Sequence, residues 1–118
     1  MIAALALTAL AGSAAAQTTG CSRAPTQMEA SRCAAAGAEA ADAELNAVWT
    51  EAFGAAKGGP AAEPLRAAQR AWIAYRDLAC AAEADQRQGG SIAPMIRAAC
   101  LERLTPARAA DLKLFYET

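Results

Sequence analysis

The stretch that decides the fold is residues 64–86, PLRAAQRAWIAYRDLACAAEADQ. It is rich in strong helix formers, and its apolar side chains recur every three or four positions, as on one face of a helix. Pro64 suits a first helical turn, because its missing N–H would be unpaired there anyway. We therefore predict a helix from about Pro64 to about Gln86. Its expected buried stripe comprises Leu65, Ala68, Trp72, Tyr75 or Arg76, and Ala79. The side chains expected to face solvent are Gln69, Arg70, Asp77 and Glu83.

The residues before this stretch predict a longer helix. Thr26 and Glu29 have the spacing of a capping box, in which Thr26 accepts a hydrogen bond from an early backbone N–H and Glu29 reaches back to the cap. The helix should run to about Ala56, since residues 57–60 (KGGP) break helices. Five of its apolar side chains recur at three- and four-residue spacing and share one face, which we expect to be core. They are Leu45, Val48, Trp49, Ala52 and Phe53.

The residues after it predict one or two further helices. Gly89 and Gly90 indicate a tight turn, and Ser91 is the expected N-cap of a helix with Pro94 in its first turn. Thr105-Pro106 repeats this cap-then-proline pattern, which predicts a bend and a fourth helix through Leu112 and Phe115. The expected inner face of the third helix is Ile96, Cys100 and Leu104. No apolar run alternates as a strand would, so the expected fold class is all-α, a small disulfide-stapled bundle of three to four helices.

Residues 1–16 resemble a signal peptide. Residues 2–11 (IAALALTALA) have the length of an apolar signal core, and small residues follow, so we predict cleavage after Ala16. That would leave residues 17–118 as one helical domain, periplasmic or secreted, with no second apolar stretch of membrane length. Cys21 follows a sequence that loosely resembles a lipobox but lacks its aliphatic residue, so lipidation of Cys21 stays open.

The four cysteines, Cys21, Cys33, Cys80 and Cys100, are expected to form structural disulfides in an oxidising compartment. Four cysteines allow three pairings. A helical hairpin that turns near residue 59 leaves Cys33 about five residues from the level of Cys80. A turn near Gly89 and Gly90 instead places Cys80 and Cys100 level. We therefore predict the pairs Cys80–Cys100 and Cys21–Cys33.

Composition argues against several classes of function. The chain has no histidine and no C-x-x-C motif, which argues against a zinc ribbon, a thioredoxin-like site and c-type haem attachment, so no metal or other cofactor is expected. No nucleophile has a recognisable base beside it, so we do not expect an enzyme. A formal net charge of −1 without a basic stripe argues against nucleic acid as a partner.

The motifs, taken together and in order, resemble the lysozyme inhibitor LprI family over about residues 21 to 114. The resemblance rests on the spaced cysteines, residues 41–46 (ADAELN), residues 69–77 (QRAWIAYRD), the turn at residues 89–91 (GGS), and Leu104-Thr105 with Arg108. Trp49 is a departure, since the family more often has tyrosine there.

The resemblance implies a small exported bacterial helical protein, some of whose relatives inhibit lysozyme by binding and without catalysis. Loops at residues 57–60 and 86–91 are the projections expected to enter a lysozyme cleft. An envelope adaptor that binds another bacterial protein is the alternative. Whether the motif residues serve packing or a partner surface stays open, although Arg76 and Asp77 could tie the second helix to the third by hydrogen bonds. The candidate binding residues are Trp72, Tyr75, Arg76, Asp77, Gly89, Gly90 and Ser91.

Overall fold

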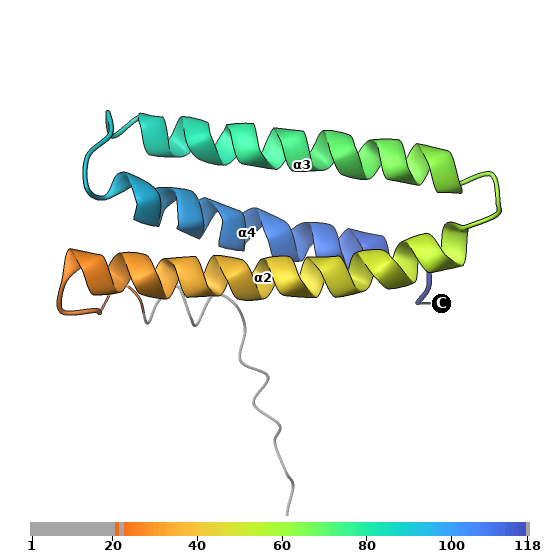
Figure 1. Cartoon of the computed structure of the whole chain (residues 1–118), viewed down its shortest axis with the longest axis horizontal. Helices are drawn as coiled ribbons and strands as arrows, with labels where there is room; N and C mark the ends of the chain where they lie inside the picture. The colour runs from red at the N-terminus through yellow and green to blue at the C-terminus, as the bar shows by residue number, and fades with distance from the viewer. Residues whose placement is uncertain (1–20, 22, 118) are drawn as a thin grey trace, which may run out of the picture.

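The described part of the protein is a bundle of three long helices. The computed structural model describes residue 21 and residues 23–117, with α2 at Gln27–Ala56, α3 at Ala62–Asp85 and α4 at Ala93–Lys113 (Figure 1). These residues contain no strand, which confirms the predicted all-α class. None of the three helices has an apolar run of the length needed to cross a bilayer. The predicted signal peptide and its cleavage site after Ala16 lie outside the described residues.

The helices run up, down and up, so α2 and α4 are parallel and α3 is antiparallel to both. α4 makes most of its contacts with α2 and fewer with α3, whereas α2 and α3 hardly touch each other. In Figure 1, α4 accordingly lies between the other two helices. α3 therefore has a neighbour on one side and an outer face on the other.

The α2 boundaries confirm their prediction. The Glu29 backbone N–H donates to the Thr26 side-chain oxygen at 3.1 Å, which is half of the predicted capping box. At the other end, the backbone N–H of Lys57 donates to the carbonyl oxygen of Phe53 at 2.8 Å. Gly58 follows with φ +84°, a conformation that favours glycine, so the chain turns where the sequence predicts.

The start of α4 differs from its prediction. Ser91 is not the N-cap: the cap position is Ile92, and no side chain caps the helix. The turn itself supplies the acceptors, because Ala93 N–H donates to the Gly90 carbonyl at 3.0 Å and Ile96 N–H to the Ile92 carbonyl at 3.1 Å. Gln88 and Gly89 have positive φ in this turn, and Pro94 lies in the first helical turn as predicted.

The predicted fourth helix is also wrong, because α4 continues unbroken through Pro106. Proline removes one N–H and with it one helical hydrogen bond. The helix nevertheless has buried residues both before and after Pro106. They are Thr105 before it, and Ala109 and Leu112 after it. Burying Leu112 alone contributes roughly 1.5–3 kcal/mol, which favours continuing the helix over turning it.

Two apolar clusters lie at opposite ends of the bundle. The turn-end cluster, near the α2–α3 turn, joins all three helices and includes the predicted core residues Leu45, Val48 and Ala52, with Trp49 packed against it. The cysteine-end cluster joins α2 to α4 through small side chains. Its buried members are Cys21, Ala34, Ala38 and Ala98.

The inward side of α3 is more polar than predicted. Gln69 is buried rather than exposed, because it follows Leu65 by one helical turn and its Oε1 accepts a hydrogen bond from Arg108 Nε at 2.8 Å. Ala68 is exposed instead. Of the two alternatives for the next turn, Arg76 faces inward and Tyr75 outward, where it is 61% exposed.

The predicted inner face of α4 holds for Cys100, which is fully buried, but Ile96 and Leu104 are only partly buried. A helix between two neighbours buries more than one stripe, and Glu102 is buried as a result. Its carboxylate packs against Gly37 on α2, where a Cβ would come within 2.5 Å of Glu102 Oε2. Within the described part of the chain, neither carboxylate oxygen has a hydrogen-bond partner.

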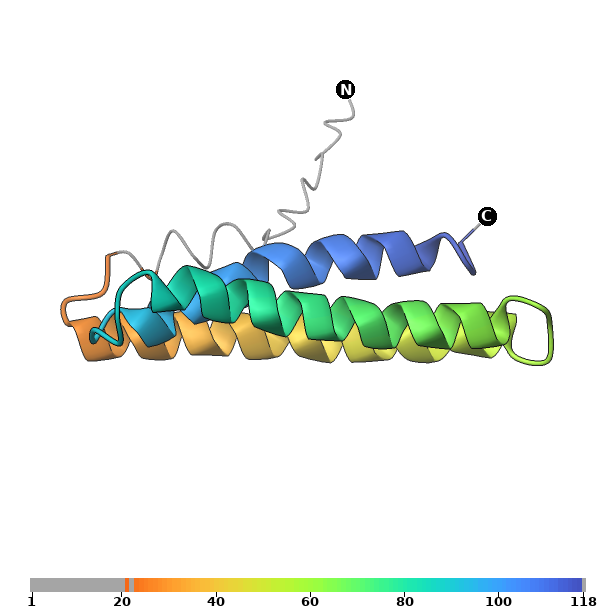
Figure 2. The same ribbon diagram turned by 90° about the horizontal axis from the view of Figure 1, so that it is seen from above.

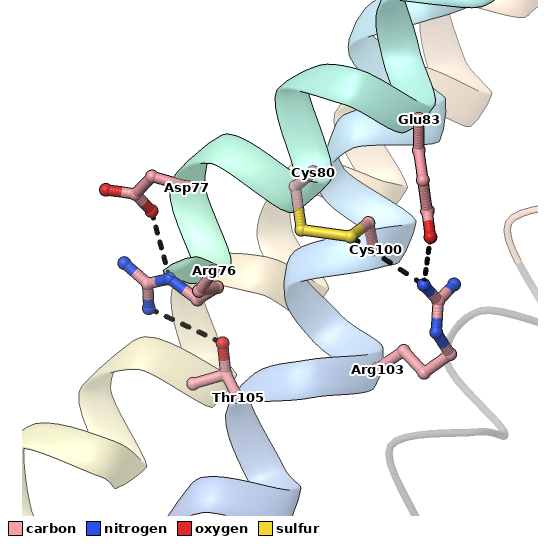
Figure 3. Close-up of a disulfide and its surroundings, with 7 residues drawn as sticks. All are labelled: Arg76, Asp77, Cys80, Glu83, Cys100, Arg103 and Thr105. Carbon is pink, nitrogen blue, oxygen red and sulfur yellow. Dashed lines mark hydrogen bonds and ion pairs between the residues drawn. A yellow bond between two sulfur atoms is a disulfide. The ribbon is translucent and has the colours of Figure 1, made fainter. Parts of the chain in front are cut away.

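Both predicted disulfides are present. Cys21 bonds to Cys33 and Cys80 to Cys100, with Cα–Cα distances of 5.3 and 5.4 Å. The first bond fixes the residue before α2 to the helix, and the second joins α3 to α4 near their connecting turn (Figure 3). With its sulfur in this bond, Cys21 has no thiol free to carry a lipid.

Candidate functional site

Arg76 connects the three helices at the middle of the bundle. Its Nη1 donates to Asp42 Oδ1 on α2 at 3.1 Å, and its Nε donates to the neighbouring Asp77 Oδ1 at 3.0 Å. Nη1 also lies 3.5 Å from the hydroxyl of Thr105 on α4 (Figure 3). The Arg76 side chain is only 13% exposed, so these bonds operate partly shielded from water.

The ring of Trp72 supports this arrangement from one turn earlier in α3. The guanidinium carbon of Arg76 lies 5.2 Å from the ring centroid, within the range of a cation–π contact. Trp72 itself packs against the turn-end cluster. The predicted hydrogen-bond link between α3 and α4 is therefore present. Arg76 makes it, whereas Asp77 does not, and Arg76 also links α3 to α2.

A groove opens beside Arg76 where α2, α3 and α4 meet. Its volume is about 270 Å³. The side chains that line it are Ala38, Glu39 and Asp42 from α2, Arg76 and Asp77 from α3, and Arg97, Leu101 and Thr105 from α4. The walls thus combine three carboxylates with two guanidinium groups. Such a groove can form ion pairs and hydrogen bonds with polar side chains of a partner.

The charge around this groove is unevenly distributed between helices. α2 carries five carboxylates, all exposed, against a single arginine, which gives a net charge of −4. α4 carries four basic residues against two acidic ones. Of the α2 carboxylates, Glu39 and Asp42 border the groove. The carboxylates of α2 are Glu29, Glu39, Asp42, Glu44 and Glu51.

The candidate binding residues do not form one site. Trp72, Arg76 and Asp77 gather at the groove and beneath it, whereas Tyr75 projects from the outer face of α3. Residues 89–91 are exposed in the α3–α4 turn, beyond the end of α3. Asp77 precedes that helix end by eight residues, or about 12 Å along the axis.

Several groove residues were not among the candidates from the sequence. Asp42 and Thr105 lie within the motifs quoted above, so the sequence carried a signal for both. Glu39 and Arg97 lie outside every motif, and only the packing of the helices brings them together. In the described part of the chain, no three metal-binding side chains cluster.

Comparison with known proteins places the chain in a family. The model of the family described as lysozyme inhibitor LprI matches residues 19–112. An uncharacterized protein of Rhizobium meliloti (strain 1021) is 37% identical over 110 residues, which covers 83% of this chain and 79% of that protein. No solved structure matches the chain. The matched segment contains all three helices almost completely, together with both disulfides. The chain therefore belongs to the LprI lysozyme inhibitor family.

Proposed function

We propose that this protein binds a lysozyme and blocks its substrate cleft without catalysing a reaction. The observation that carries the proposal is the family match across residues 19–112. Lysozyme cleaves glycosidic bonds in a cleft with two carboxylates, so a rigid protein that fills the cleft is sufficient to stop it. A packed three-helix bundle supplies such rigidity, with one disulfide between α3 and α4 and another that fixes the segment before α2.

We propose the acidic edge of α2 and the adjoining groove as the contact surface. The edge consists of Glu39 and Asp42, both exposed, with Arg97 across the groove on α4. Glu39 makes no ion pair within the described residues. A carboxylate without a partner can pair with a basic lysozyme at no cost to the fold. This surface supplements the two turns predicted to project into a cleft, which lie at opposite ends of the bundle (Figure 1).

We further propose that the protein acts outside the cytoplasm, with residues 1–16 as its export signal. Two structural disulfides in one small domain fit an oxidising compartment. Mass spectrometry of the exported protein tests this, since the mature chain should begin at Gln17 and contain no free thiol. A chain that keeps residue 1 in the periplasmic fraction would contradict it.

The central test is an inhibition assay with the purified oxidised protein against animal and bacteriophage lysozymes. We expect loss of lysozyme activity at micromolar inhibitor for at least one class. Glu39→Lys should weaken inhibition about tenfold, because it places a cation opposite a basic enzyme. Glu51→Lys is the matched control, as it makes the same charge change at an exposed position of α2 outside the groove. Full activity of every lysozyme would remove the proposal, and recovery of a different protein in a periplasmic pull-down would favour the adaptor alternative.

A further inference from the structure

The outer face of α3 carries large apolar side chains that nothing in the described chain covers. Leu78 is 72% exposed and Tyr75 is 61% exposed. They lie one helical turn apart, on the side of α3 opposite to Cys80 and the other buried residues. Figure 2 looks onto this side of the bundle, and no other helix lies over α3. The exposed alanines on this side are Ala67, Ala68, Ala71, Ala74 and Ala82.

An apolar pocket adjoins the same face near the start of α3. Its volume is about 240 Å³, of the size of an aromatic side chain. Its walls are Ala61, Pro64, Leu65, Ala68, Arg108 and Phe115. Ala68 precedes Tyr75 by seven residues, or two helical turns, so both lie on the same flank of the exposed face. One flank of α3 therefore carries the protruding Tyr75 ring and, two turns earlier, the pocket beside Ala68.

The opposite flank carries charges at the same seven-residue interval. Glu63, Arg70 and Asp77 follow one another along it. Among the described residues Arg70 has no ion-pair partner, whereas Asp77 uses one oxygen for Arg76 and keeps a side chain that is 47% exposed. An unpaired cation and a carboxylate with an uncommitted oxygen thus lie two turns apart on one edge.

We propose that a second copy of this chain packs antiparallel against the outer face of α3 and forms a two-fold symmetric dimer. In the proposed register, residues whose numbers sum to 145 lie opposite each other, so Leu78 of one copy lies over Ala67 of the other. In the same register Tyr75 of one copy and Ala68 of the other lie on the same flank and are offset by two residues, about 3 Å along the axis. The Tyr75 ring spans this offset and enters the pocket between Ala68 and Phe115. On the other flank Arg70 and Asp77 are offset by the same two residues, about 3 Å, which the long arginine side chain can span.

Self-complementarity is the argument for a second copy rather than an unrelated partner. A two-fold interface requires that each patch find its complement on the same surface. Here one register satisfies both flanks, and symmetry produces each contact twice. The alanines near the axis permit close approach of the two helices. An unrelated partner would need to present an aromatic ring and a charge pattern that α3 already carries in matching positions.

The mass of the oxidised protein in solution, measured by analytical ultracentrifugation from about 1 μM to about 1 mM, tests the proposal. We expect the measured mass to rise with concentration from that of a monomer to that of a dimer. Leu78→Glu and Arg70→Glu should each raise the dissociation constant at least about tenfold, since the first removes apolar contact and the second places two pairs of like charges together. The matched controls are Met28→Glu and Arg32→Glu, which replace a large apolar side chain and an arginine by glutamate at exposed positions of α2.

A photo-reactive phenylalanine derivative in place of Tyr75 tests the register directly. It should cross-link to the segment of a second copy that contains Ala61, Pro64 and Ala68. Circular dichroism should show unchanged helix content for every variant, because all the substituted side chains are exposed.

A single-chain mass throughout the concentration range would overturn the proposal. So would a dimer that is insensitive to Leu78→Glu and Arg70→Glu, or a cross-link to α2. If the chain is monomeric and Leu78→Glu abolishes lysozyme binding instead, the face belongs to that partner. Failure of dimerisation leaves lysozyme inhibition unaffected, so the two proposals are tested separately.

Discussion

The two ends of the bundle are held together in different ways. Near the α2–α3 turn, large side chains such as Leu45, Leu65 and Leu112 fill the space between three helices. At the other end, the buried side chains are mostly alanines and cysteines, and two covalent bonds join the elements. Alanine buries little apolar area, so packing alone stabilises that end weakly. The disulfides therefore provide the stability that the small apolar core of the cysteine end does not.

Truncation at the turn end should produce the largest effect. Leu112 is fully buried where α4 meets the other two helices. Leu112→Ala should lower the free energy of unfolding by about 3–4 kcal/mol, from lost apolar burial and the cavity left behind. Urea denaturation monitored by circular dichroism measures this. Leu114→Ala is the control, because Leu114 is 77% exposed and its loss should change stability by less than about 0.5 kcal/mol. Equal effects at both positions would show that α4 does not dock as described.

Removing the covalent link should weaken the cysteine end selectively. The Cys80–Cys100 bond closes a span of 20 residues. The double substitution Cys80→Ala/Cys100→Ala should cost about 3 kcal/mol, because the unfolded chain regains the entropy of an open loop. Hydrogen exchange should then show the last turns of α3 and the first turns of α4 losing protection before the Leu45 region. Uniform loss of protection would contradict the division into two differently held ends.

The Arg76 side chain joins the two ends, and its removal should have an intermediate effect. Arg76→Ala removes charge-assisted bonds to Asp42 and Asp77 and the contact with Trp72. We expect a loss of about 2 kcal/mol, since bonds to charged groups contribute roughly 1.5–3 kcal/mol each and the carboxylates regain water. Arg76→Lys should restore only part of it, because an ammonium lacks the planar fork of donors. Arg97→Ala, at a groove position without an ion pair in the described residues, should change stability by less than about 0.5 kcal/mol.

The sequence predicted the features that depend on local rules. The cap at Thr26, the break after Ala56 and the pairing of Cys80 with Cys100 follow from cap chemistry, from glycine and from the position of a turn. The core residues Leu45, Val48 and Ala52 followed from helical periodicity.

Features that depend on a neighbouring helix were missed. Gln69 was assigned to solvent because it is polar, yet Arg108 from α4 supplies its partner. The break at Pro106 was expected from a local pattern that tertiary burial of Leu112 overrides. The groove shows the same limit, because Glu39 and Arg97 become neighbours only when α2 packs beside α4.

The smallest expected effect concerns the cysteine end, where Glu102 packs against Gly37. The buried Glu102 carboxylate loses its hydrogen bonds to water and forms none with the described residues, which destabilises the fold. Glu102→Met, which keeps the approximate volume, should therefore raise the free energy of unfolding by about 1 kcal/mol. Gly37→Ala should lower it, because the new Cβ would come within 2.5 Å of Glu102 Oε2 and the buried Glu102 side chain would have to shift.

A double-mutant cycle separates these two causes. Combined with Glu102→Ala, the Gly37→Ala change should lose most of its cost, since the Cβ then occupies space that the carboxylate has left. A coupling of about 1 kcal/mol between the two positions would show that α2 approaches α4 closely because position 37 has no side chain. Independent, additive effects would instead mean that the small-residue packing of the cysteine end does not extend to Glu102, and the boundary between the two ends would have to be drawn nearer Cys33.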